Sequence, residues 1–391
     1  MTGEPIVRIA ARGDGVTASG RHIALAAPGD LVDEAGALTP GPHHQLPPCR
    51  HFPECGGCQL QHVDDAAYRR YLVDRIAGAL AAQGLEADIR EPHLSPPRSR
   101  RRGTLRAMRV GKGVLLGFNA ERSHRIVDMR ECHVLRPELF ALVAPLRGLL
   151  GTILPAKRQA EVSLTLCDQG VDVALSGVAA EGLAAAEALT AFAERHALAR
   201  LSLDEGYGLE TRFEPRPATV TLSGTPVALP SGAFLQATED GERALVAAVL
   251  EGVAGARRTA DLFAGLGTFA LALPGQVHPA EAARDAVLAL KAARPSASVE
   301  HRDLYRRPLS APELAGFEAV VLDPPRSGAE MQVRDLATAS VPRVAYVSCN
   351  PATFARDARI LTDGGYALRW VRPVGQFRWS THVELVASFT R

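Results

Sequence analysis

The chain has 391 residues, of which 47% are hydrophobic and 22% charged, and its formal net charge at pH 7 is +1. This length and composition leave room for two or three domains with cores of their own, which excludes a largely disordered protein. A net charge this close to zero gives no sign of a polyanionic partner, so any such signal has to be local.

The start of the chain, MTGEPIVRIA, lacks the basic and then apolar pattern of a secretory signal. No apolar run is long enough to span a bilayer, so we expect a cytoplasmic protein that does not enter a membrane. In that reducing compartment, clustered cysteines are more often metal ligands or catalysts than disulfides.

The first stretch, residues 6–36, contains short apolar segments broken by Gly-Asp turns, which predicts a small β unit over 1–45. The proline- and histidine-rich TPGPHHQLPP then leads to the loop CRHFPECGGCQLQH. Three of the six cysteines lie in this loop, namely Cys49, Cys55 and Cys58. Glycines between the last two let the backbone fold tightly, so that the sulfur atoms can face one centre.

A site with four ligands needs one more group. Cys132 in MRECHVL is the best candidate, because Cys167 lies in the middle of a predicted strand. Four thiolates suit an iron–sulfur cluster. On ligand chemistry alone, structural zinc with His51 or His62 as a ligand is an equal alternative.

The region 46–230 is predicted to be α+β. A helix is expected over 65–83, followed by a basic block in which RSRRR (98–102) precedes further basic residues up to Lys112. Hairpins and one amphipathic helix follow over 160–229. A solvated loop is the plain alternative for the basic block, but its arginine density favours contact with RNA phosphates. The candidate RNA-binding residues are Arg98, Arg100, Arg101, Arg102 and Arg106.

From about residue 231 to 391, apolar strands alternate with helices, which predicts an open α/β sheet with crossover helices. TADLFAGLGTFAL has the pattern of a strand that enters a glycine-rich turn and then a helix, with Asp261 at the strand end and Gly265 and Gly267 in the turn. The pattern G-x-G-x-F favours a class I S-adenosylmethionine (SAM) pocket over an NAD site, and no ATP-type phosphate loop is present.

Three further acids follow the predicted strands of this region: Glu281, Asp303 and Asp323. Because ligands bind open sheets at the carboxyl ends of the strands, we expect these acids to gather in one crevice. A solvated loop is the more frequent setting for an acid like Asp303, and less so for Asp323 in LDPPR.

Two residues are candidates for catalysis. Cys349 directly follows the apolar strand RVAYVS, so it is a candidate nucleophile at the mouth of the crevice, with a small buried side chain as the alternative. Glu384 interrupts the apolar run of THVELVASF. A half-buried glutamate there is a candidate general base with a raised pKa, and a charge on an edge strand is the alternative.

Taken together, the motifs CRHFPECGGCQLQH, GFNAERSHRIVDMRECHVL, SGAFLQ, DLFAGLGTF, LDPPRSG, YVSCNPATFARD and THVE resemble the RNA uracil-5-methyltransferase family, and specifically its iron–sulfur branch. The resemblance extends from residue 49 to 391. It implies a class I SAM-dependent, Rossmann-like catalytic domain over 231–391 and a central α+β domain with an iron–sulfur loop over 46–230. The unit over 1–45 would be a short counterpart of the TRAM domain, which is an oligonucleotide-binding (OB)-like barrel.

The resemblance also implies residue roles. Cys349 would be the nucleophile and Glu384 the base, and a 4Fe-4S cluster would be held by Cys49, Cys55, Cys58 and Cys132. Contacts with SAM would come from Gln236, Phe263, Thr268, Glu281, Asp303 and Asp323, beside Asp261, Gly265 and Gly267.

The resemblance implies 5-methyluridine formation in 23S ribosomal RNA, with the same reaction on tRNA as the alternative, by an enzyme that we expect to be a monomer. Two other functions compete with it. LDPPR could belong to an adenine amino-methyltransferase, which leaves Cys349 and Glu384 without roles. The chain could also be a non-catalytic RNA-binding protein with structural zinc.

Overall fold

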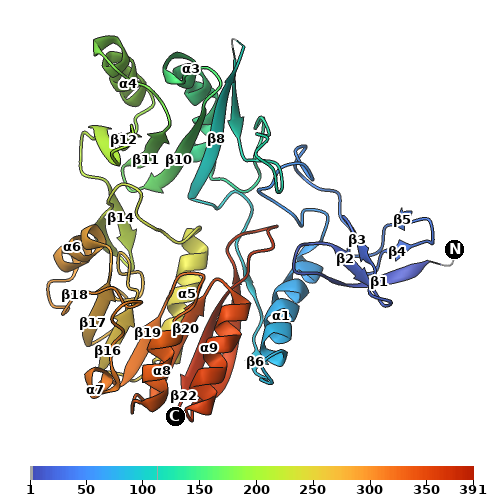
Figure 1. Cartoon of the computed structure of the whole chain (residues 1–391), viewed down its shortest axis with the longest axis vertical. Helices are drawn as coiled ribbons and strands as arrows, with labels where there is room; N and C mark the ends of the chain where they lie inside the picture. The colour runs from blue at the N-terminus through green and yellow to red at the C-terminus, as the bar shows by residue number, and fades with distance from the viewer. Residues whose placement is uncertain (1–2, 112) are drawn as a thin grey trace.

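The computed structural model describes residues 3–111 and 113–391, so Lys112 of the basic block lies outside it. Figure 1 shows a small N-terminal sheet, a central sheet with its helices, and a large C-terminal sheet covered by helices. The predicted α/β multidomain fold is thereby confirmed. No helix of the described ranges has the length and apolarity needed to cross a membrane.

The N-terminal sheet confirms the predicted small β unit. Its strand order is β3-β2-β1-β4-β5 with antiparallel neighbours, and Ile6, Ala26 and Val32 form its core. The strands are β1 (Glu4–Ile9), β2 (Gly15–Thr17), β3 (His22–Ile23), β4 (Leu31–Val32) and β5 (Leu38–Thr39).

The central sheet has the order β13-β12-β11-β10-β8-β9, and helices α2, α3 and α4 pack against it. Inward-facing residues alternate along β10, where Val162 and Leu164 join the core and the residues between them are half-buried. The elements are β8 (Arg102–Val110), β9 (Gly113–Gly117), α2 (Pro137–Ala141), α3 (Val143–Ile153), β10 (Gln159–Cys167), β11 (Gly170–Ser176), α4 (Leu183–Arg195), β12 (Arg200–Asp204) and β13 (Leu209–Phe213).

The C-terminal sheet has the order β18-β17-β16-β19-β20-β22-β21-β6, and β7 also pairs with β21. Strands β16 to β20 are parallel, and β22 runs antiparallel between β20 and β21. The strands are β6 (Asp88–Ile89), β7 (His93–Leu94), β16 (Arg258–Leu262), β17 (Gln276–Glu281), β18 (Glu300–His301), β19 (Ala319–Leu322), β20 (Arg343–Ser348), β21 (Ala367–Gly375) and β22 (Glu384–Thr390).

Helices cover both faces of this sheet. Val320 of β19 packs in one cluster with Leu72 and Phe354, whereas its neighbour Val321 packs in another with Leu245 and Val287. A strand that is buried on both faces, such as β19, has apolar residues at consecutive positions, so it could be predicted from the sequence. The helices are α5 (Glu239–Gly252), α6 (Arg284–Ala293), α7 (Ala311–Leu314), α8 (Glu330–Thr338) and α9 (Pro351–Asp363).

Several segments from the region 46–230 pack with the C-terminal sheet. Helix α1 (Asp65–Ala81) begins with Asp64 as N-cap and buries its apolar face against α9 and β21, while β6 and β7 extend the sheet. The hairpin β14 (Thr219–Leu222)–β15 (Thr225–Ala228) packs on α6. The divisions at 45/46 and 230/231 stay a prediction about chain segments, since packing crosses the second of them.

Candidate active site

The glycine-rich turn after β16 leaves space for a ligand. Gly265 has a φ of +54°, and a Cβ placed there would have no atom within 4 Å. At Gly267 (φ +95°), a Cβ would lie 2.4 Å from Leu290 Cδ1. The first glycine therefore opens a cradle beside the strand end, and the second allows close packing against α6.

The segment after this turn differs from the prediction. A helix was expected, but residues 265–272 form consecutive turns, among them Leu271 N to Gly267 O at 2.9 Å. Pro274 and Gly275 precede β17, which starts at Gln276, so few residues are left for a helix. Phe263 (φ +65°) and Thr268 lie in the same loop, and both are half-buried.

The acids predicted to gather in one crevice differ in their surroundings. Asp261 is fully buried, and neither of its carboxylate oxygens has a hydrogen-bond partner among the described residues. Burial, followed by the charges of Asp323 and Glu281, raises the pKa of Asp261 to about 8. Glu281 ends β17 and accepts bonds from Gly265 N at 2.8 Å and Ala283 N at 2.7 Å.

Asp303 is exposed two residues beyond β18 and accepts from Tyr305 N at 3.0 Å. Asp323 directly follows β19, and burial raises its pKa to about 7. An unpartnered buried carboxylate, a second one of raised pKa and an open glycine cradle fit a ligand that carries both positive charge and hydrogen-bond donors, as SAM does.

Cys349 lies where β20 ends, half-buried and just before Asn350, which caps α9 by accepting from Ala352 N. The pKa of the Cys349 thiol is raised to about 11: burial is the main cause, the charges of Glu384 and Asp323 add to it, and Arg326 acts in the opposite direction. Ser348 pairs with Leu385 across β20 and β22, so Cys349 and Glu384 lie at the same end of these neighbouring strands.

Glu384 is the first residue of β22 and is buried. Since β22 lies between β20 and β21, the alternative of a charge on an edge strand is wrong. The pKa of Glu384 is raised to about 8. Burial is the main cause and the charge of Asp323 adds to it, whereas the hydrogen bond from Gln376 and the charge of Arg102 act in the opposite direction.

One residue of the crevice was missed by the sequence analysis. Gln376 donates from Nε2 to Gln236 Oε1 at 2.8 Å and also to Glu384 Oε2. Gln236 in turn donates to Asp323 Oδ2 at 3.5 Å. No pattern in the sequence around Gln376 indicates this position, because Gln236 lies 140 residues away in the chain.

A polar cavity of about 450 Å³ lies beside the segment before β22, and Arg100, Arg102, Phe377 and His382 are among its lining residues. The guanidinium carbon of Arg102 lies 4.5 Å from the ring centre of Phe234, and that of Arg100 lies 5.3 Å from the ring centre of Phe377. Phe234 is exposed and Phe377 is half-buried, and two arginines beside aromatic rings suit unpaired nucleotides.

The other arginines of the basic block differ in their exposure and in their partners. Arg98 is exposed in a surface groove, and Arg106 lies beside the loop 119–124 and pairs with Glu161 at 2.7 Å. Arg101 is only 3% exposed and bonds with Glu242 and with Gln236 O. The prediction that Arg101 contacts RNA is therefore wrong, because its guanidinium is buried in an ion pair.

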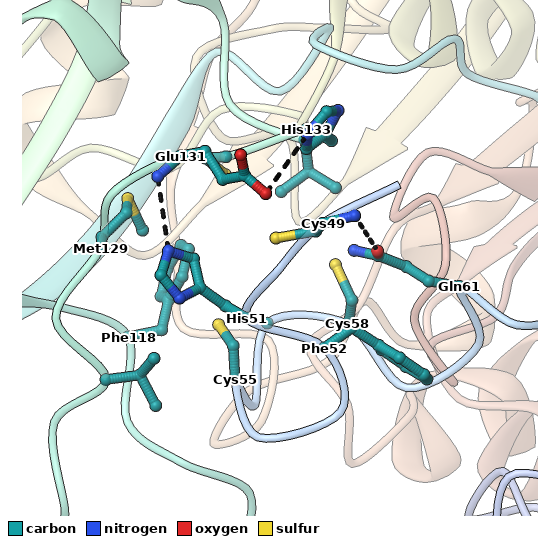
Figure 2. Close-up of a pocket in the computed structure, with 14 residues that line it drawn as sticks. Cys49, His51, Phe52, Cys55, Cys58, Gln61, Phe118, Met129, Glu131 and His133 are labelled. Atoms are coloured by element: carbon teal, nitrogen blue, oxygen red, sulfur yellow. Dashed lines mark hydrogen bonds and ion pairs between the residues drawn. The ribbon is translucent and has the colours of Figure 1, made fainter. Parts of the chain in front are cut away.

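The four cysteines predicted as ligands line one cavity, where Figure 2 shows the sulfur atoms of Cys49, Cys55 and Cys58 facing one another. The pKa of Cys55 is raised to about 11 and that of Cys58 to about 12, mainly by burial and in smaller part by the charges of the neighbouring cysteines. Such repulsion between thiolates is relieved when they share a cationic centre.

The histidines considered as zinc ligands differ in their relation to this cavity. Within residues 3–111 and 113–391, no group of three or more His, Cys, Asp or Glu is arranged to hold a metal ion. His51 lines the cavity, but its Nε2 accepts from Arg130 N at 2.9 Å, and His62 is not among the lining residues. Cys167 lies at the end of β10, where it bonds with Gly170 O.

The cysteine loop is hydrogen-bonded to the segment before β22 at the backbone carbonyl of Trp379. Gln59 N and Leu60 N both donate to Trp379 O, at 2.8 Å and 2.9 Å. Trp379 also packs against Cys58 and Val134. The loop and the segment before β22 therefore hold each other in place.

Comparison with known proteins agrees with this geometry. Residues 297–390 match the family model described as tRNA (uracil-5-)-methyltransferase. An uncharacterised RNA methyltransferase of Zymomonas mobilis is 51% identical over 99% of both chains. The 23S rRNA (uracil(1939)-C(5))-methyltransferase RlmD of Halomonas elongata is 36% identical over 86% of this chain and 75% of its own.

Among solved structures, the tRNA (uracil-54, C5)-methyltransferase of Pyrococcus abyssi, in complex with S-adenosyl-L-homocysteine, superposes with a TM-score of 0.76. It covers 99% of both chains at 23% identity, which shows a shared fold. Together with the sequence relatives, these matches identify the chain as a member of the RNA uracil-5-methyltransferase family, whose enzymes use SAM to methylate C5 of uracil in RNA.

Proposed function

We propose that this enzyme forms 5-methyluridine at one position of 23S ribosomal RNA through a covalent Cys349–uracil adduct. The observation that carries the mechanism is the placement of Cys349 beside the buried Glu384 at the end of the C-terminal sheet. Membership of the RNA uracil-5-methyltransferase family speaks against the two competing functions, which were adenine methylation and RNA binding by a non-catalytic zinc protein.

The roles follow from the chemistry of uracil. The Cys349 thiolate adds to C6, which makes C5 nucleophilic enough to take the methyl group of SAM, and S-adenosylhomocysteine is left. Glu384 then removes the C5 proton, and the electron pair of that C–H bond restores the C5–C6 double bond as the cysteine sulfur departs. The uridine has to leave its stack to reach both groups.

The cofactor would be held along the strand ends. We assign its contacts to the glycine cradle, to Phe263 and Thr268 in the same loop, and to the four acids and one amide around it. These residues are Gln236, Asp261, Phe263, Gly265, Gly267, Thr268, Glu281, Asp303 and Asp323. The orphaned carboxylate of Asp261 supports this assignment most directly.

For the cysteine cavity we propose a 4Fe-4S cluster held by Cys49, Cys55, Cys58 and Cys132, with zinc as the alternative. Four thiols from two segments line one cavity, whereas His62 does not line it and Nε2 of His51 already accepts from Arg130 N. Protein purified without oxygen should contain iron and sulfide together. Stoichiometric zinc without iron would refute the cluster.

The substrate RNA would bind along the polar cavity and its rim through Arg98, Arg100, Arg102 and Arg106. The likeness to the Halomonas enzyme over most of the chain favours 23S rRNA, and tRNA is the alternative because the family model is named for it. We further propose that the enzyme acts in the cytoplasm as a monomer.

The substrate is tested by mapping 5-methyluridine in both RNA pools of a strain that lacks the gene. We expect the modification to disappear from one site in 23S rRNA and to return with a plasmid copy. Loss from tRNA alone would assign the enzyme to tRNA.

A further inference from the structure

Gln376 is fixed in one orientation by the backbone around it. It follows β21, is 2% exposed, and its Oε1 accepts from Ala237 N at 2.8 Å and from Thr238 N at 3.4 Å. Only an oxygen can accept these bonds, so the NH₂ end of the amide has to point the other way.

That NH₂ group uses both of its hydrogens on the crevice. One goes to Gln236 Oε1 at 2.8 Å and the other to Glu384 Oε2. Gln236 is thereby oriented too, because its oxygen faces Gln376 and its nitrogen faces Asp323 Oδ2 at 3.5 Å. One side chain thus sets the positions of the base and of a cofactor contact.

The surrounding packing leaves Gln376 little freedom. A Cβ at Gly241 of α5 would lie 2.7 Å from Gln376 Cβ, so the helix and the glutamine are already in close contact. Thr238 is held by Ser95, with 2.8 Å between their hydroxyl oxygens, and caps α5 by accepting from Gly241 N at 3.1 Å. The donors to Gln376 therefore belong to a well-fixed helix start.

We propose that Gln376 is the positioning residue of the general base: it holds the Glu384 carboxylate toward the substrate and stabilises its ionised form. This inference rests on the proposed function, in which Glu384 removes the C5 proton. A hydrogen bond from a neutral amide favours the charged form of its acceptor.

The charge balance around Glu384 makes this bond important. Arg102 of β8 attracts the carboxylate, whereas Asp323 after β19 repels it, and the Cys349 thiol after β20 lies beside both. Without the Gln376 amide, Arg102 would be the only stabilising partner left in this set. The Glu384 pKa, raised to about 8 in the folded protein, would then rise further.

The test is the pH dependence of RNA release after methyl transfer in a single turnover. Release requires ionised Glu384, so its midpoint reports the pKa of the base. In Gln376→Met, which keeps the volume but removes the donors, we expect the covalent adduct to form and to persist. The midpoint should move up by about one pH unit, and raising the pH should restore release.

Two further variants keep the test decisive. Gln376→Glu retains an oxygen for Ala237 N and places a second carboxylate against Glu384, so it should also raise the midpoint, even if the methionine variant folds poorly. Gln332→Met is the matched control: Gln332 is 1% exposed and bonds with Leu309 N and O, outside the crevice. It should lower the melting temperature and leave the midpoint unchanged.

An unchanged midpoint in both Gln376 variants would overturn the inference, as would an equal shift in Gln332→Met. The proposed function is judged separately by Glu384→Gln. If that variant traps RNA while Gln376→Met releases it normally, only the positioning role fails. If Glu384→Gln releases RNA normally, the assignment of the base fails.

Discussion

At the scale of single residues, the crevice contains several acidic side chains whose pKa values are raised in the protein without a ligand. Burial raises the pKa of Asp261 and Glu384 to about 8 and that of Asp323 to about 7. Buried carboxyls of this kind mark functional sites more often than structural ones. They suit a site that receives a sulfonium cation.

The nucleophile is the first test. Cys349→Ala should lower methylation by roughly a thousandfold or more, because no other thiol is placed at the end of β20. Binding of S-adenosylhomocysteine, measured by calorimetry, should remain. Undiminished turnover would reject Cys349 as the nucleophile.

The role of Glu384 as the base is tested by the covalent RNA adduct that should accumulate when Glu384 is replaced. Glu384→Gln should form the methylated adduct and fail to resolve it, since the amide cannot accept the C5 proton. The adduct is visible as a band that survives denaturation on a gel. A variant that turns over normally would remove Glu384 from the mechanism.

The raised pKa values also predict a proton balance. A cation near Asp261, Asp323 and Glu384 stabilises their ionised forms, so their pKa values fall on binding and protons are released near pH 7–8. SAM affinity should therefore rise with pH through this range.

Calorimetry of SAM binding in two buffers of different ionisation enthalpy measures the release directly. Asp323→Asn should release fewer protons than the parent enzyme. Proton uptake on binding, or none at all, would contradict the arrangement.

At the scale of elements, helix α1 supports the segment that precedes the base. The hydroxyl of the fully buried Tyr68 is 3.0 Å from Phe377 O and 3.1 Å from Ser380 O, across more than 300 residues of sequence. These bonds add to the apolar face of α1, including Leu72 and Ile76, which is buried in one cluster with residues of the C-terminal sheet.

Tyr68→Phe should reduce the free energy of unfolding by about 1 kcal/mol and slow turnover, because the carbonyls lose their donor. Tyr366→Phe is the control, since the Tyr366 hydroxyl donates to Val341 O at 2.7 Å, outside the crevice. It should lose similar stability in a denaturant titration while keeping its turnover. Equal turnover in the two variants would show that α1 does not affect the site.

The success of prediction from sequence differed between elements for physical reasons. The strands β19 and β20 are largely apolar runs, and Asp323 and Cys349 directly follow them, so both residues lie at the strand ends that the sequence predicted. Asp261 lies one residue before the end of β16, where the glycine-rich turn that follows was the signal. Two-residue strands such as β6 and β18 carry no periodicity and depend on tertiary pairing. Neither the burial of Arg101 nor the bonds of Gln376 has a local pattern that could reveal it.

At the scale of the whole molecule, the polar cavity is lined in part by residues from the cysteine loop, β8, β10 and the segment before β22. A substrate in this cavity touches segments that are far apart in the chain. Phosphate binding by the exposed Arg98, which lies in a separate surface groove, should make RNA affinity dependent on salt.

Two arginines three residues apart should therefore respond differently. Arg98→Gln should reduce the slope of log affinity against log salt by roughly one, because one phosphate contact is lost. Arg101→Gln should leave the slope unchanged and destabilise the fold by about 3 kcal/mol, because Glu242 stays buried without its partner. Filter binding at several salt concentrations and a denaturant titration distinguish them, and equal slopes in both variants would contradict the assignment.

The carbonyl of Trp379, which accepts from both Gln59 N and Leu60 N, has a consequence for the living cell. If the cysteine cavity holds an oxygen-sensitive cluster, oxidative loss of that cluster would loosen the segment that leads into β22. Glu384, the proposed base, is the first residue of that strand. Iron-starved or heavily aerated cultures would then make under-methylated RNA at an unchanged enzyme level, so that the modification would record the metal supply of the organism.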